Sequence, residues 1–344
     1  MTTGGARSNM TAGVAFLAMM ALSAALLAGF FGTFHPALDS FSHFRIHLSV
    51  LTVLLALPLL ASSYRLQAVA ALVFAVASLV TTASALPRLW PEQAVARPTD
   101  QIVYSLLQMN LRYDNPTPKK VLSLIGHANP DVITLQEVSD MWVTELDYIK
   151  SAYPYRILCA HPDGVFGVGI LSRRPFASGT DASCFGNGSM AMATIDLGGS
   201  EVDVAAIHLD WPWPRNQSRR IGELSEPLSL LGETALLAGD FNATPWSAAI
   251  RRVATLGDLR LMPSVGPTWL HRKLPEFLRF AGLPIDQVFS KGAVTIHSAT
   301  RLESAGSDHL PVLVEFSLRP EAPKPEEGNA TATVWLSRAA GADG

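Results

Sequence analysis

The chain has 344 residues, only 16% of them charged, and a formal net charge of −3. A net charge so close to zero excludes the broad positive field by which many proteins hold nucleic acid without regard to its sequence. The two cysteines do not form a Cys-x-x-Cys pair, so the sequence predicts no structural zinc site.

The apolar content is concentrated before Pro87, in runs over residues 11–34, about 46–61 and 66–86. The first run carries no charged residue and exceeds the roughly 20 residues that a helix needs to cross a bilayer. A cleaved signal peptide has an apolar part of only about 7–15 residues. Buried helices of a soluble core are the other alternative, but these runs lack polar faces. We therefore predict a membrane region over residues 1–89 with three transmembrane helices.

The charges that flank these runs do not orient them in a membrane. Arg7 and Arg65 fall on one side, whereas Arg45, Arg88 and Arg97 fall on the other. The positive-inside rule gives no clear answer from so few charges. Three spans would place the N-terminus and the rest of the chain on opposite sides.

The remainder divides into a linker, one large domain and a tail. Residues 90–100 are polar and interrupted by proline, which is typical of a connector. Residues 101–319 have the length of one sizeable α/β domain. Residues 320–344 are rich in Pro, Glu, Ala and Gly, a composition that predicts disorder.

Within the domain, short apolar runs predict strands and amphipathic runs predict helices. The predicted strands cover residues 102–110, 132–137, 155–160, 167–172, 190–197, 202–209, 235–238, 285–289 and 311–316. The predicted helices cover residues 117–128 and, despite Pro227, 218–231. Many strands with interspersed helices favour two sheets packed face to face with helices outside.

The most informative stretch is Gly239-Asp-Phe-Asn242, which follows the buried strand at 235–238. Because side chains alternate along an extended chain, Asp240 and Asn242 are expected to point the same way. A carboxylate there can bind a hard cation, and a carboxamide can donate to an anionic oxygen. An ordinary Asx-type turn after a strand is the alternative.

Three other predicted strands also end in polar residues: Asn110, Gln136-Glu137 and His208. A carboxylate directly after a buried strand, such as Glu137, needs a partner, and a bound Mg²⁺ would supply one. The alternatives are a carboxylate at a helix N-terminus for Glu137 and a hydrogen-bonded structural histidine for His208.

The last polar cluster, Asp308-His309, precedes the final strand. A histidine can take a proton from water when an acid orients its other ring nitrogen. Asp286 is the candidate for that acid, which leaves Asp308 free to bind metal. A polar turn is the alternative interpretation of Asp308-His309.

In this order the segments resemble the endonuclease/exonuclease/phosphatase superfamily, the DNase-like fold, over residues 102–318. The segments that carry the resemblance are Asn110, Gln136-Glu137, Gly169-Ile-Leu-Ser-Arg173, His208, Gly239-Asp-Phe-Asn242, Asp286 and Ser307-Asp-His309. The Trp-Pro pairs at 211–214, Pro267-Thr-Trp269 and Pro284-Ile-Asp286 look most like a bacterial, membrane-associated branch. Gln287 departs from the pattern, because related chains often have histidine after the aspartate.

The resemblance implies a four-layer α/β sandwich that binds Mg²⁺ or Mn²⁺. The metal ligands that it implies are Asn110, Glu137 and Asp308. It implies that His309, oriented by Asp286, deprotonates the attacking water, and that Asp240 and Asn242 position the nucleophile and the phosphate. His208 would stabilise or protonate the leaving oxygen.

The activity expected is hydrolysis of a phosphodiester. DNA or RNA is one substrate class, and a lipid headgroup is another, because membrane helices would hold the site close to a bilayer. A catalytically inactive membrane-bound binding module is the alternative, against which the intact set of polar residues argues. The expected location is a bacterial inner membrane with the domain outside the cytoplasm, where Cys159 and Cys184 could pair. The sequence identifies no protein partner.

Overall fold

The computed structural model describes residues 3–85 and 101–319. The predicted linker at 90–100 and the predicted tail at 320–344 lie outside these described residues.

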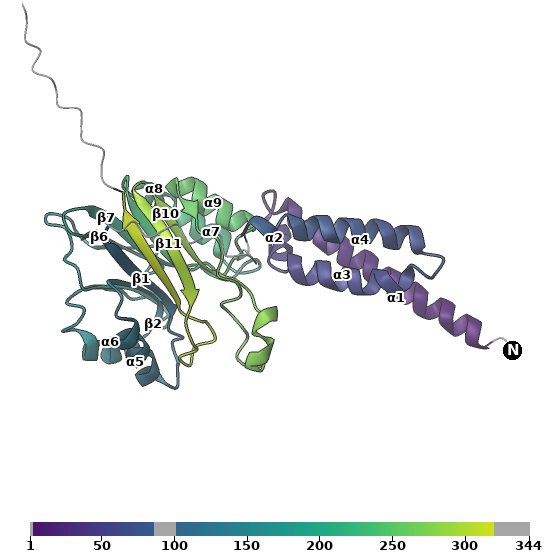
Figure 1. The fold of residues 1–344 in the computed structure, drawn as a ribbon, viewed down its shortest axis with the longest axis horizontal. Coiled ribbons are helices and arrows are strands. Elements are labelled where there is room, and N and C mark those ends of the chain that lie inside the picture. The colour runs from purple at the N-terminus through teal and green to yellow at the C-terminus, as the bar shows by residue number, and fades with distance from the viewer. Residues whose placement is uncertain (1–2, 86–100, 320–344) are drawn as a thin grey trace, which may run out of the picture.

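The domain contains two six-stranded mixed sheets (Figure 1). The first has the order β11-β12-β1-β2-β4-β3, and its strands are Val294–Arg301, Val312–Leu318, Val103–Asn110, Val132–Val138, Gly167–Ser172 and Tyr155–Cys159. The second has the order β5-β6-β7-β8-β10-β9, and its strands are Ser183–Phe185, Met190–Asp196, Glu201–His208, Ala235–Asp240, Asp286–Lys291 and Arg260–Leu261. Each sheet has one parallel pair at its centre, β1 with β2 and β7 with β8.

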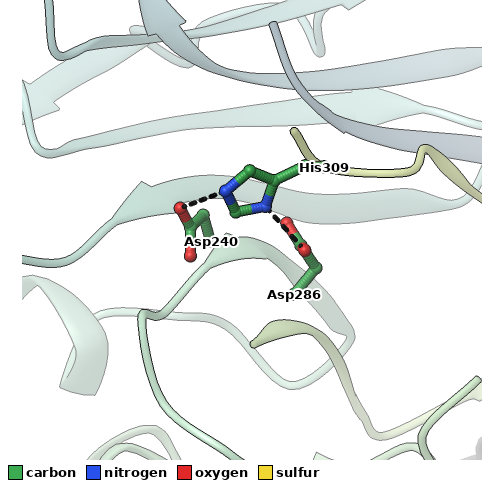
Figure 2. A group of neighbouring side chains, drawn as sticks. All are labelled: Asp240, Asp286 and His309. Atoms are coloured by element: carbon green, nitrogen blue, oxygen red, sulfur yellow. Dashed lines mark hydrogen bonds and ion pairs between the residues drawn. The ribbon is translucent and has the colours of Figure 1, made fainter. Parts of the chain in front are cut away.

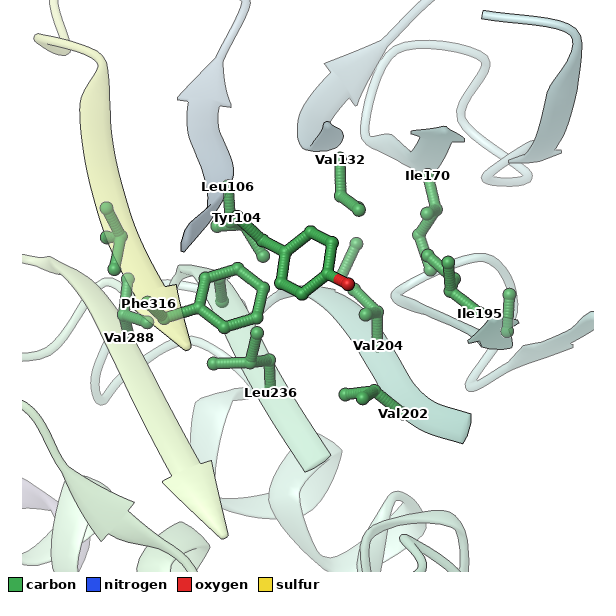
Figure 3. Close-up of a cluster of buried hydrophobic side chains, with 14 of the residues drawn as sticks. Tyr104, Leu106, Val132, Ile170, Ile195, Val202, Val204, Leu236, Val288 and Phe316 are labelled. Carbon is green, nitrogen blue, oxygen red and sulfur yellow. The ribbon is translucent and has the colours of Figure 1, made fainter. Parts of the chain in front are cut away.

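The main core lies between the two sheets. Figure 3 shows Tyr104 and Phe316 of the first sheet facing Val204 and Leu236 of the second. Helices α5 (Pro118–Ala128) and α6 (Asp140–Leu146) cover the outer face of the first sheet. Helices α7 (Gln217–Glu223), α8 (Ser225–Ser229) and α9 (Ala248–Gly257) cover the second. Two packed mixed sheets with flanking helices confirm this part of the predicted fold.

Some elements differ from the prediction. The helix expected over 218–231 is two helices, α7 and α8, which meet at Leu224. Pro227 explains the break, because proline has no N–H to donate and its ring clashes with the carbonyl four residues earlier, that of Glu223. Strands β5, β9 and β11 were not predicted, because they are either very short or rich in polar residues.

The N-terminal region is helical: α1 (Thr3–Ala28), η1 (Gly29–Phe31), α2 (Pro36–Ser42), α3 (Arg45–Leu59), α4 (Arg65–Val80) and η2 (Ala83–Ala85). Helices α1, α3 and α4 lie side by side and project away from the sandwich (Figure 1). One helix, over residues 10–31, is long and apolar enough to cross a membrane. Helices α2 and α3 pass that test only as a pair bent by 63°, and α4 has only 16 residues.

The prediction of three transmembrane helices is therefore not matched in the part of the chain that the structure describes. The second apolar run forms α3, which has only 15 residues and is separated from α2 by the bend near His43, and the third run stops being α-helical at Val80. A 16-residue helix is about 24 Å long, which is shorter than the roughly 30 Å hydrocarbon layer.

Much of the interior of this helical bundle is made of small and weakly polar side chains, although Met19, Leu26 and Leu59 are also buried. Ser49, Thr52 and Ala56 of α3 are buried, as are Ala68, Ala71, Ala75 and Ser78 of α4. The large apolar side chains point outward: Leu54 is 59% exposed, and Val73 is 66% exposed. So many large apolar side chains on the outside are unusual for a soluble bundle.

The bundle is fastened to the sandwich through α2. The Asp39 carboxylate accepts hydrogen bonds from the backbone N–H groups of Ala248 (2.8 Å) and Ala249 (2.9 Å), the first two residues of α9. The Trp246 indole N–H donates to the Ser42 carbonyl. A carboxylate at a helix N-terminus satisfies unpaired N–H groups and complements the helix dipole. Asp39 thus caps a helix more than 200 residues away in the sequence.

A disulfide between Cys159 of β3 and Cys184 of β5 joins the two sheets. Strands β3 and β5 are edge strands of different sheets, so the bond ties the sandwich together along one side. We expect a variant with Cys159→Ser and Cys184→Ser to lose about 2–4 kcal/mol of unfolding free energy, since the bond closes a loop of moderate length. Urea denaturation of the detergent-solubilised chain measures this. Reductant should destabilise the native chain but not the variant, and equal midpoints for both chains would contradict the expectation.

Candidate active site

A cavity of about 550 Å³ opens at one end of the sandwich. Six of the eight predicted site residues line it: Glu137, His208, Asp240, Asn242, Asp308 and His309. The other two, Asn110 and Asp286, are buried and hydrogen-bonded to residues that line the cavity. The structure therefore brings all eight predicted side chains together at one place.

Strand register explains much of this convergence. His208 is paired with Asp240 across the parallel strands β7 and β8, and Asp240 is paired with Asp286 across the antiparallel strands β8 and β10. Three chemically active side chains thus stand in one row across the second sheet. His309 reaches this row from the loop before β12.

Asp240 is the centre of the site. Its Oδ2 atom accepts a hydrogen bond from Asn110 Nδ2 (3.0 Å) and lies 3.6 Å from His309 Nε2 and 3.7 Å from His208 Nε2. Its Oδ1 atom accepts from the Asn242 backbone N–H. Burial raises the pKa of Asp240 to about 6, although the nearby His309 acts in the opposite direction.

His309 lies between two carboxylates (Figure 2). Its Nδ1 atom is 2.9 Å from Asp286 Oδ2, and its Nε2 atom faces Asp240. The other Asp286 oxygen accepts from Gln108 Nε2 (2.9 Å), so the carboxylate is held on both sides. Burial alone would lower the pKa of His309, but the charges of Asp286 and Asp240 and the hydrogen bond to Asp286 outweigh it and raise the pKa to about 10.

Glu137 reaches the cavity because of a backbone irregularity. The register of β2 against β4 shifts between Gln136 and Val138, and Glu137 has a positive φ of 56°. A bulge of this kind re-aims one side chain, and a left-handed non-glycine residue is a strained conformation often found at functional sites. The Glu137 carboxylate accepts from Asn110 Nδ2 (3.1 Å) and from the Tyr113 backbone N–H (3.0 Å).

Asn110 acts in this arrangement as a bridge between carboxylates. Its amide nitrogen donates to both Glu137 and Asp240, whereas its oxygen accepts from the Arg112 backbone N–H. The group predicted as a metal ligand thus presents its nitrogen to the two acidic side chains.

Asn242 lies in the cavity wall for a different reason from the one predicted. Strand β8 ends at Asp240, and Asn242 has a left-handed φ of 49°, so a turn and not strand alternation directs it. Its Nδ2 atom donates to the Leu209 carbonyl (2.8 Å). Its Oδ1 atom is buried without a hydrogen-bond partner among the residues that the structure describes.

The cavity has the composition of a site for a hard cation. Within residues 3–85 and 101–319, no lysine or arginine forms an ion pair with Glu137, Asp240 or Asp308. Asp308 Oδ2 accepts only the Trp269 indole N–H, at 3.1 Å. Carboxylate oxygens are the ligands that Mg²⁺ and Mn²⁺ favour. Ligand atoms of Asp240, Asp286 and His309 also lie within 4.8 Å of one another, although His309 and Asp286 already bond to each other.

Several residues of the site were not predicted from the sequence. His161 and Phe166 reach the cavity from the loop between β3 and β4, and nothing in their spacing indicated this. Gln108 is fully buried and links Asp286 to Gln136. Gln287, where related chains often have histidine, donates to the carbonyls of Ala243 and Pro284 and so has a structural role here.

Comparison with known proteins agrees with this geometry. The profile of the Endonuclease/Exonuclease/phosphatase family matches residues 107–309, more than half of the chain. The chain therefore belongs to this family, whose members are usually metal-dependent hydrolases of phosphoesters. No curated protein sequence matches the chain.

Solved structures show the same fold at low sequence identity. A Bacteroides vulgatus endonuclease/exonuclease/phosphatase is 17% identical, with a TM-score of 0.53, over 64% of this chain and 100% of that one. TDP2 from D. rerio, in a complex with a single-strand DNA product, is 19% identical, with a TM-score of 0.52, over 62% and 99% of the two chains. A Beutenbergia cavernae protein is 20% identical, with a TM-score of 0.50, over 63% and 72%.

Proposed function

We propose that the protein is a membrane-anchored, divalent-metal-dependent phosphodiesterase in which His309 activates the attacking water. The observation that carries the proposal is the placement of His309 between Asp286 and Asp240 in the wall of an open, acidic cavity. The family's usual chemistry, hydrolysis of phosphoesters, supports it.

The cation would be held by the carboxylates of Glu137 and Asp308, with Asn110 beside them. When bound, it supplies positive charge that offsets the charge of the phosphate. Glu137 is already aligned for this role by the hydrogen bonds from Asn110 and the Tyr113 backbone. Mg²⁺ and Mn²⁺ are the expected ions, because all of the offered ligands are oxygen atoms.

His309 acts as the general base. Asp286 holds the imidazole through Nδ1, which leaves Nε2 directed at Asp240 and the cavity. Asp240 positions the water against Nε2, and the Asn242 amide contacts the phosphate with its remaining N–H. A base with a pKa near 10 is protonated at neutral pH, and the positive charge of a cation bound nearby would lower that pKa toward the useful range.

His208 faces the same oxygen of Asp240 from the other side of the site. Its other ring nitrogen lies 3.4 Å from the Phe166 carbonyl, and its ring contacts that of Phe166 edge-on. This position suits a group that stabilises or protonates the leaving oxygen, while His309 serves the attacking one.

The helical bundle supports membrane anchoring. The helix over residues 10–31 is long enough to span, and only 17% of its most apolar stretch is buried. Helices α3 and α4 pack against it with small residues inside and large apolar residues outside. The disulfide favours an oxidising compartment for the sandwich, which is the extracytoplasmic side of a bacterial inner membrane.

The detergent-solubilised full chain provides the test. We expect hydrolysis of bis-p-nitrophenyl phosphate with Mg²⁺ or Mn²⁺, loss of that hydrolysis with EDTA, and recovery when metal is restored. Single-stranded DNA belongs in the same assay, because the D. rerio relative was crystallised with a DNA product. A folded chain that binds these phosphodiesters without hydrolysing them under any metal would instead be an inactive binding module.

A further inference from the structure

The 3-10 helix η4 (Glu276–Ala281) exposes two large aromatic side chains. Phe277 is 75% exposed and Phe280 is 77% exposed, and the neighbouring Leu274 is 49% exposed. Single exposed apolar residues are common on soluble proteins, but three on one short loop form an apolar surface that normally has a partner. The partner is indicated by the position of the loop in the fold.

Helix η4, the short light-green helix beside the sandwich in Figure 1, contacts the end of the bundle. The Ala281 carbonyl lies 2.8 Å from Nε2 of His47, in the first turn of α3. This is the end of the bundle that meets the sandwich. Other exposed aromatic residues gather in the segments at this end: Phe30, Phe31, Phe34, Phe41, Phe44 and Trp213. Aromatic side chains concentrate where a membrane helix leaves the hydrocarbon layer.

The same loop forms part of the active-site wall. Trp269, His271 and Arg272, just before η4, line the cavity. Arg279 of η4 reaches back and donates to the carbonyls of Thr268 and Asp308, each at 2.8 Å. A shift of η4 would therefore displace the segment that carries Asp308.

A second loop of the cavity wall also runs to the end of the bundle. Trp211 lines the cavity, and its ring meets that of Trp269 with 5.3 Å between centroids. Two residues later, the Trp213 carbonyl accepts from Ser40 Oγ of α2 (3.2 Å). The loop that carries Trp269 and the loop that carries Trp211 thus both run from the cavity to the end of the bundle that meets the sandwich.

We propose that residues 274–281 insert into the membrane interface and hold the mouth of the cavity against the lipid surface. The substrates that this arrangement favours are phosphodiesters of lipid headgroups displayed on that surface. Leu274, Phe277 and Phe280 are the inserting side chains. The exposed Lys273 beside them suits anionic headgroups, whereas Arg272 forms an ion pair with Asp114 (3.6 Å). The substrate class rests on the proposed function, whereas the membrane contact does not.

The contact is tested without any activity measurement. The full chain carrying Phe280→Cys is spin-labelled without reductant and reconstituted into phosphatidylethanolamine–phosphatidylglycerol vesicles. Tyr148→Cys, at a site that is equally exposed at 77% but lies in the 3-10 helix η3 (Asp147–Ile149) after α6, is the matched control. We expect the label at 280 to collide with oxygen and to be shielded from a water-soluble nickel complex, and the label at 148 to show the reverse. Equal access of the nickel complex to both labels would overturn the proposal.

The substrate class is tested by comparing hydrolysis of the vesicle lipid with hydrolysis of the soluble diester bis-p-nitrophenyl phosphate by the same reconstituted protein. We expect the variant with Phe277→Ser and Phe280→Ser to lose at least tenfold in hydrolysis of the vesicle phospholipid, with bis-p-nitrophenyl phosphate hydrolysis unchanged. Tyr148→Ser should alter neither rate. Wild-type hydrolysis of the soluble diester without any hydrolysis of lipid would reject the lipid substrate alone. Failure on both substrates would reject the proposed function and leave the labelling result to decide the membrane contact.

Discussion

Replacing His309 by glutamine is expected to lower the turnover of a phosphodiester by about 10³-fold, the usual contribution of a positioned general base. Glutamine preserves most of the side-chain volume but cannot take a proton from water. We expect the packing in the buried site to be retained well enough for the chain to fold, although the hydrogen bond between Nδ1 and Asp286 is lost. Initial rates at saturating Mg²⁺, normalised to folded protein, provide the measurement.

The matched control is His297→Gln. His297 lies on β11, where Nε2 contacts Ser317 Oγ, and it does not line the cavity. This variant should keep the full rate. If His309→Gln retained more than a tenth of the wild-type rate, the base would have to be another group, and the proposed role of Asp286 would also fail.

The stability of the metal-free protein is expected to fall steeply as the pH rises from about 7 to 10. His309 has a folded-state pKa raised from 6.5 to about 10 by Asp286 and Asp240, so the folded chain holds a proton that the unfolded chain releases. This contribution is fully present below pH 6.5 and is lost as the pH rises through 10. Each unit of pKa shift corresponds to about 1.4 kcal/mol, so the total loss amounts to several kcal/mol.

Urea denaturation in EDTA at a series of pH values measures this loss, and His309→Gln should remove most of the slope. The titration of the buried Asp240 does not overlap with the pH range in which His309 is measured. Its pKa is raised to about 6, so the stability that it contributes at low pH is lost between its unfolded value of 3.8 and about 6, below the window used for His309. His297→Gln should keep the wild-type slope. Parallel curves for the wild type and His309→Gln would show that the imidazole is not held charged by its two neighbours.

The sequence predicted the centre of the fold better than its periphery. The buried strands β1, β2, β7 and β8 are strongly apolar and end in polar residues, so both their existence and their functional ends could be recognised. The edge strand β9 has two residues, and the break between α7 and α8 depends on a single proline. The local sequence pattern alone does not predict a two-residue strand or the position of a helix break.

The site could be predicted as a set of residues but not as a geometry. The bulge that aims Glu137 places a non-glycine residue in a left-handed backbone conformation without a sequence signal, and the turn that aims Asn242 was only the alternative interpretation of that stretch. The contributions of Gln108, His161 and Phe166 arise from contacts between distant segments. The transmembrane prediction overestimated two helices, because hydropathy does not show where a helix begins and ends inside or beside an apolar run.

The hydrogen bonds from α9 to Asp39 have a practical consequence for anyone who studies this protein. Removing the first 85 residues to obtain a more tractable enzyme would leave the amides of Ala248 and Ala249 and the indole of Trp246 without their partners. Trp246 is only two residues from Thr244, whose amide bonds the His43 ring, and four from Asn242 in the cavity wall. A shortened enzyme would therefore report on a disturbed pocket, and kinetic work belongs on the intact polypeptide in detergent or lipid.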